Sequence, residues 1–125
     1  MVHVDTSALI AALSGTRSAA PALRSCIRDG VRVGLCTLVL YEWWRGPRTA
    51  LELEYQEALF PRAMAVGFGV HEATAAADLC RRLRKPRDRE IDLAIAACAI
   101  VHGAALWTLN PQDFKDVPGL ELAVL

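Results

Sequence analysis

Four acidic side chains in mostly apolar surroundings are the residues of this chain best suited to do chemistry: Asp5, Glu42, Asp92 and Asp113. Asp92, for example, lies inside Ile91–Ala97, where every other residue is apolar. Carboxylates in such surroundings are costly to bury unless they are paired, protonated or bound to a metal ion. If the fold brings them together, they repel one another at neutral pH, and a hard divalent cation relieves that repulsion. The four acids therefore predict a metal site.

Each acid also has an ordinary structural explanation when it is considered alone. Asp5 can cap the helix that follows it, Glu42 can be a surface residue of a helix, and Asp113 can be a turn residue. Asp92 can be stabilised by the dipole of a helix whose N-terminus lies nearby. The prediction of a metal site therefore depends on the four acids acting together.

A run of positive charge directly precedes Asp92. Six of the nine residues at positions 81–89 are basic, and only Asp88 opposes them there. Such a run is commonly a solvated helix end and loop. Beside a cluster of carboxylates it also suits a phosphodiester enzyme, because cations hold the phosphate backbone while the acids hold the metal. We expect Arg84, Lys85 and Arg87 to make these phosphate contacts.

The composition describes one globular domain, residues 1–125, with 54% hydrophobic and 22% charged residues and no net charge. A chain of this length can bury a substantial core. No run of 18 uncharged apolar residues occurs and the N-terminus lacks a signal-peptide pattern, so we expect no membrane association. Four scattered cysteines without a CxxC pair are expected to be buried thiols in a reducing cytosol. We therefore expect a cytoplasmic protein.

The elements that must position these residues alternate along the chain between short apolar runs and helical patterns. Strands are expected at Val2–Val4, Val31–Cys36, Ala104–Leu109 and Leu120–Leu125, and a short strand or extended link at Met64–Val70. Helices are expected at Ser7–Leu13, Ser18–Asp29, Thr49–Phe60, Glu72–Leu83 and Glu90–His102. A further helix is expected to start at a Thr37 cap, carry Glu42 and end at Gly46-Pro47, and Thr6 or Ser7 is expected to cap the first helix.

Strands separated by helices predict a parallel sheet with right-handed crossovers and helices on both faces. Ligands of such sheets bind at the carboxyl ends of the strands. Asp5 and Thr108–Asp113 follow strands, whereas Glu42 and Asp92 lie near the N-terminal turns of helices. We therefore expect the four acids to converge on one edge of the sheet.

Four strings, in order along the chain, resemble the motifs of PIN-domain proteins: Val4-Asp5-Thr6-Ser7-Ala8-Leu9-Ile10, Glu42 followed by Arg45-Gly46, Ile91–Ala97, and Leu106–Phe114. In size and motif the chain is similar to the VapC-type toxin ribonucleases of type II toxin–antitoxin pairs. Asp-Thr-Ser alone is a weak signal, but four motifs in order over nearly the whole chain are a strong one. The resemblance implies a three-layer α/β/α fold with a central, mostly parallel sheet.

The resemblance further implies metal-dependent hydrolysis of phosphodiester bonds in RNA, with the first three acids at the metal-binding positions of the family. The family varies at its fourth position, which here is either Asn110 or Asp113. We expect Asp113 to be the fourth carboxylate, with Thr108 and Asn110 as supporting polar groups.

Oxygen-only ligands favour Mg²⁺ or Mn²⁺ over zinc. Magnesium keeps several waters and takes one or two direct carboxylates, so we expect the remaining acids to act through water. The ion would lower the pKa of a bound water and offset charge on the leaving oxygen, and one or two ions are both compatible with the sequence. No histidine is needed as a base, and His3, His71 and His102 are expected to be structural or exposed.

The resemblance also implies three partners: an RNA substrate, a cognate antitoxin protein and a second copy of the chain. The segments Thr37–Trp44 and Thr49–Phe60 carry more apolar surface than a small monomer readily covers. We therefore expect a two-fold dimer with some of their aromatic side chains at or near the seam. Trp43-Trp44 is bulkier than the PIN pattern at this point, and Glu90 adds an acid that the pattern does not need.

Two other functions fit parts of the sequence. A non-catalytic PIN-like RNA-binding or interaction module would keep the fold without using a metal, and the retained carboxylates disfavour it. A flap-type DNA nuclease usually needs additional helices that clamp a duplex, and 125 residues leave no room for them.

Overall fold

The computed structural model describes residues 1–125 and contains a three-stranded parallel sheet. Strand β1 (Val2–Val4) lies between β2 (Val33–Gly34) and β3 (Ala105–Trp107). In this register Val2 pairs with the first residue of each neighbouring strand. The central strand is buried along its whole length, as expected of a parallel strand covered on both faces.

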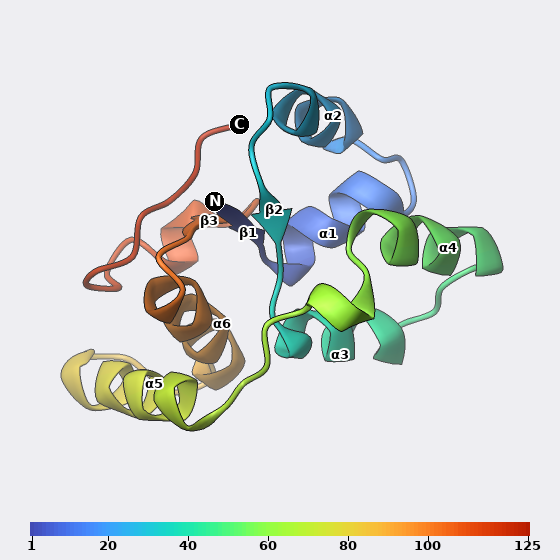
Figure 1. Ribbon diagram of the computed structural model, residues 1–125. Helices are drawn as coiled ribbons and strands as arrows, with labels where there is room; N and C mark the ends of the chain where they lie inside the picture. The colour runs from blue at the N-terminus through green and yellow to red at the C-terminus, as the bar shows by residue number, and fades with distance from the viewer.

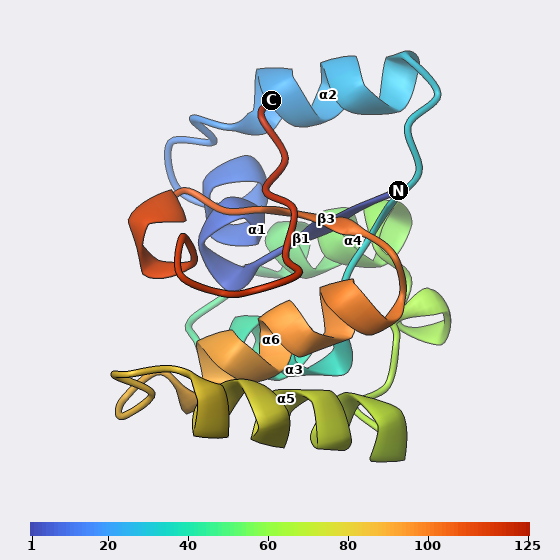
Figure 2. The same ribbon diagram turned by 90° about the vertical axis from the view of Figure 1, so that its left-hand side faces the viewer.

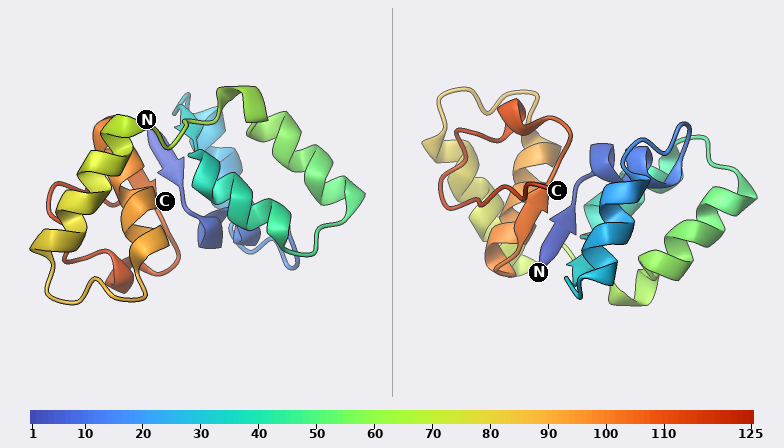
Figure 3. Two further views of the ribbon diagram at one scale, coloured as in Figure 1. Left: turned by 90° about the horizontal axis from the view of Figure 1, so that it is seen from below. Right: turned by 90° about the horizontal axis from the view of Figure 1, so that it is seen from above.

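Six α-helices surround this sheet, with the bounds α1 (Thr6–Leu13), α2 (Ala20–Arg28), α3 (Thr37–Arg45), α4 (Ala50–Leu59), α5 (Val70–Arg82) and α6 (Glu90–Val101). Two short 3-10 helices are η1 (Arg62–Met64) and η2 (Pro111–Asp113). Helices α5 and α6 lie on one side of the sheet, and α1 to α4 gather on the other (Figures 1 and 3). This is the three-layer α/β/α arrangement predicted from the sequence.

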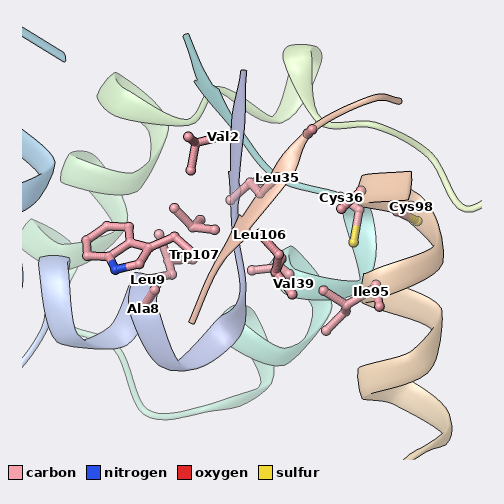
Figure 4. Close-up of a cluster of buried hydrophobic side chains, with 14 of the residues drawn as sticks. Val2, Ala8, Leu9, Leu35, Cys36, Val39, Ile95, Cys98, Leu106 and Trp107 are labelled. Carbon is pink, nitrogen blue, oxygen red and sulfur yellow. The ribbon is translucent and has the colours of Figure 1, made fainter. Parts of the chain in front are cut away.

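Helix α6 shows why the sequence folds in this way. Its residues Leu93–Ala99 are all buried, because α5 covers one side of the helix and the sheet and α3 cover others. A helix that is apolar on every side requires such a sandwiched position. The side chains of Figure 4 come from this region, where Ile95 and Cys98 of α6 face Val39 of α3.

Two helix caps differ from the prediction. The N-cap of α1 is Asp5, not Thr6 or Ser7, because the Asp5 carboxylate accepts the backbone N–H of Ala8. The N-cap of α3 is Cys36, so that Thr37 is already the first helical residue. In both cases the helix starts immediately after the strand segment, one residue earlier than predicted.

The predicted outer strands are shorter than expected. The strand predicted at Leu120–Leu125 is reduced to one bridge, between Leu122 and Leu106. The segment Met64–Val70 is not a strand either, since it holds the end of η1, a single bridge at Val66 and the start of α5. None of the helices combines the length and the apolar character that crossing a membrane requires.

Candidate active site

Asp5 leads from the carboxyl end of β1 into α1. Its backbone N–H donates to the carbonyl of Trp107 (3.0 Å), which joins the ends of β1 and β3. Its Oδ1 accepts both the backbone N–H of Ala8 (2.9 Å) and the hydroxyl of Ser7 (2.7 Å). The residue is only 5% exposed, so these hydrogen bonds fix its orientation at the edge of the sheet.

Glu42 reaches the same edge from the middle of α3. Its carboxylate accepts the hydroxyl of Thr6, the residue next to Asp5, at 2.5 Å. It also lies 3.6 Å from the guanidinium of Arg45, one turn further along α3. The Thr6 hydroxyl therefore brings the first two predicted acids together, although they are far apart in the sequence.

Asp92 lies half-buried in the first turn of α6. Burial raises the pKa of its carboxyl group, and so do the negative charges of Glu42, Asp5 and Asp113, while Arg89 opposes the shift. A carboxylate that three others repel is the electrostatic arrangement that a bound cation relieves. The four predicted acids therefore face a common region, at the end of the molecule where the α5–α6 loop and η2 lie (Figure 2).

Asp113 is the exposed member of the set, at the last position of η2. Its backbone N–H donates to the carbonyl of Asn110 (3.0 Å), which closes the short helical turn. Its side chain borders an open depression of about 380 Å³ whose lining is wholly polar: Arg84, Lys85, Arg89, Gln112, Asp113 and Asp116. Two of the three predicted phosphate-binding residues thus line the same depression as the fourth acid.

The third predicted phosphate-binding residue, Arg87, is exposed on the same loop as Arg84 and Lys85. Arg89, which belongs to the same basic run, behaves differently. Its guanidinium forms a salt bridge with Asp116 (2.6 Å) and is only 20% exposed. The basic run is therefore divided between free cations on the loop and one arginine that is paired within the protein.

Hydroxyl groups support the acids at the ends of β1 and β3. The Thr108 hydroxyl accepts the backbone N–H of Asn110 (3.0 Å) and lies 3.4 Å from the Ser7 hydroxyl. The Ser7 oxygen in turn accepts the backbone N–H of Leu109 (3.0 Å). Sequence reasoning considered Thr6 and Ser7 only as caps and missed that they tie these segments together. Their position directly after Asp5 was the available signal.

The donor chemistry of the site suits a hard cation. The four side chains offer only carboxylate oxygens, which Mg²⁺ and Mn²⁺ prefer. No group of three or more His, Cys, Asp or Glu side chains is close enough to enclose an ion completely. An ion that keeps several of its waters needs only one or two direct carboxylates, so these residues fit a hydrated Mg²⁺.

The histidines lie away from the four acids. Burial and the charge of nearby His102 lower the pKa of His3 to about 4, so His3 is neutral at physiological pH. His102 contacts the buried Glu72 at 3.0 Å. These contacts agree with the expectation that the histidines are structural. The two adjacent tryptophans differ from each other, since Trp43 is wholly buried whereas Trp44 is 41% exposed.

The chain belongs to the PIN domain family, whose model matches residues 2–120. Among individual proteins, it is similar to the ribonuclease VapC19 of Mycobacterium tuberculosis, with 32% identity over 97% of this chain and 98% of that one. Ribonuclease VapC1 of Rickettsia felis is 40% identical over 72 residues, which are 56% of this chain and 52% of that relative.

Solved structures with the same fold are toxin–antitoxin complexes. One is VapBC2 from Rickettsia felis bound to a promoter DNA fragment, with a TM-score of 0.78 at 19% identity over 98% of both chains. Another is FitAcB from Neisseria gonorrhoeae, with a TM-score of 0.73 at 17% identity over 98% of this chain and 97% of that one. At these identities the likeness establishes the fold alone.

Proposed function

We propose that the protein is a Mg²⁺- or Mn²⁺-dependent endoribonuclease and the toxin of a toxin–antitoxin pair. The observation that carries the proposal is the half-buried Asp92 carboxylate, which three other acids repel, beside a depression lined by Arg84 and Lys85. Negative charge that requires a cation and positive charge that attracts a polyanion then lie side by side. The names of the VapC relatives support RNA as the substrate.

In this proposal the residues of the chain have separate roles. Asp5, Glu42, Asp92 and Asp113 hold the hydrated ion, directly or through its waters. The ion, when bound, supplies a water of lowered pKa and offsets charge on the leaving oxygen. Thr108 and the backbone of Asn110 keep the end of β3 in place beside Asp5.

The loop between α5 and α6 holds the substrate in this proposal. Arg84, Lys85 and Arg87 carry charges that are not paired with acids of the protein, so they are available to RNA phosphates. Contacts to the backbone give affinity without reading sequence. The preference for a particular RNA would then come from other surfaces of the groove.

The proposal includes two protein partners. The complexes with the same fold contain an antitoxin, which supports a cognate antitoxin here. The exposed apolar side chains of α3 and α4, among them Tyr41, Trp44 and Leu51, support a homodimer. An RNA-cutting toxin and its antitoxin would meet their targets in the cytoplasm.

Cleavage of RNA by the purified chain tests the proposal. A pool of RNA should be cut in Mg²⁺ or Mn²⁺ and left intact in EDTA, and Asp92→Asn should abolish most of the cleavage. Glu90→Gln is the matched control, because Glu90 is an exposed acid of the same helical turn. Binding of RNA without metal-dependent cleavage would instead identify a non-catalytic PIN-like module.

A further inference from the structure

Arg89 forms an unusual number of contacts for a residue at the surface. Its guanidinium donates to both carboxylate oxygens of Asp116 (2.6 and 2.9 Å). It also donates to the backbone carbonyls of Asp113 (2.8 Å) and Lys85 (3.1 Å). One side chain at the start of α6 thus fastens two loops that are otherwise separate.

Both loops carry residues of the proposed site. The first, residues 83–89, links α5 to α6 and carries the free cations. The second, residues 110–116, contains η2 and Asp113. The buried Phe114 anchors the second loop to the core, but Asp113 itself is exposed. The hydrogen bond from Arg89 to the Asp113 carbonyl is therefore the polar contact that ties this acid to the helix of Asp92.

We infer that Arg89 is a positioning residue, which holds Asp113 in place for the metal and holds the Lys85 loop beside it through the pair with Asp116. The inference rests on the proposed function of the site. Arginine is suited to this role because its planar fork has five donors in fixed directions. Lysine would keep the charge but could not maintain all four contacts at once.

The contacts matter more for activity than for stability. Asp116 is about half exposed, and exposed ion pairs contribute little to the free energy of folding. Catalysis is far more sensitive, since a displacement of about 1 Å in a catalytic constellation can cost on the order of 100-fold in rate. Loss of Arg89 should therefore leave a folded protein with a poorly placed fourth carboxylate.

The experiment compares Arg89→Lys with Arg62→Lys. Arg62 also pairs with a carboxylate, Glu57, at 3.3 Å, but lies at η1 rather than at the site. For Arg89→Lys we expect kcat on RNA to fall about tenfold or more while KM changes little, because the charge of the loop is kept. Amide hydrogen exchange at residues 110–116 should quicken in Arg89→Lys only. Equal kcat and equal exchange in the two variants would overturn the inference.

A double-mutant cycle distinguishes positioning from a general structural effect. If Arg89 acts through Asp113, Arg89→Lys should cost much less activity in an Asp113→Asn background than in the unmodified chain. Calorimetric titration with Mn²⁺ should show the same pattern, with weaker binding for Arg89→Lys only while Asp113 is present. Equal losses in both backgrounds would refute the role of Asp113. An unmodified chain that cuts no RNA would instead count against the proposed function, and Mn²⁺ binding and hydrogen exchange would still test the positioning role.

Discussion

Replacement of Asp92 by asparagine separates the two effects of the acidic cluster, because it removes a charge and keeps the shape. Burial and three neighbouring carboxylates raise the pKa of Asp92, so the folded protein holds this group in its charged form only at a cost. Without metal, Asp92→Asn should therefore be more stable than the unmodified chain at neutral pH. The gain should be no more than about 1 kcal/mol, because the side chain is partly solvated and its interactions are screened.

The dependence of this gain on pH has a definite sign. Below the ordinary aspartate pKa of 3.8, the carboxyl group is protonated in both the folded and the unfolded chain, and its cost disappears. As the pH rises through the raised folded-state pKa, the cost appears in full. The two proteins should therefore have equal stability in acid and differ at pH 7.

Metal should reverse the order of stability. A cation that relieves the repulsion stabilises the unmodified chain more than Asp92→Asn, whose site has lost one ligand. RNA cleavage should fall on the order of 100-fold or more, as expected when several kcal/mol of charge stabilisation are lost. Thermal unfolding in EDTA and in Mg²⁺ gives the stabilities, with Glu90→Gln as the control. Lower stability of Asp92→Asn in EDTA, or unchanged cleavage, would refute the reasoning.

Three further predictions concern surfaces and the core. Replacing Arg84, Lys85 and Arg87 by alanine should weaken RNA binding and flatten its salt dependence by roughly 0.7 slope units per lost phosphate contact; an anisotropy titration at several salt concentrations measures this, and an unchanged slope would mean that the loop is merely solvated. Light scattering at tens of micromolar should show a dimer that Trp44→Ala weakens, and a monomer at that concentration would exclude the proposed seam. Trp43→Ala should lower the free energy of unfolding by about 3–5 kcal/mol, since the side chain is wholly buried, and denaturant unfolding of both tryptophan variants would reveal any error in that assignment.

The sequence predicted best the elements whose surroundings are uniform. Helix α6 was expected at Glu90–His102 and spans Glu90–Val101, because an almost wholly apolar helix has only one kind of environment. The last strand was predicted wrongly. At Leu120–Leu125 the apolar pattern is real, but only the two hydrogen bonds of Leu106, from its N–H to Glu121 and to its carbonyl from Ala123, attach the segment. Pattern alone does not show how far a sheet extends at its edge.

The candidate site was predictable to the extent that it depends on residue type. Acids in apolar surroundings indicated which side chains to consider, and the alternation of elements indicated that they would converge. The pairing of Arg89 with Asp116 was not predictable, since the residues are 27 positions apart and meet only through the paths of two loops. The contact of Thr6 with Glu42, across 36 positions, depends in the same way on how α1 packs against α3.

The two hydrogen bonds that Asp5 accepts fall on the same atom, Oδ1. One oxygen of this carboxylate therefore starts the first helix, and the other is left for chemistry. Asparagine also carries an Oδ1 and is a good N-cap, whereas alanine would sacrifice about 1 kcal/mol of helix stability. A cell that escapes the toxin through Asp5→Asn would thus still make a well-folded chain able to bind its antitoxin, so that a disarmed copy could compete for the antidote with any active one.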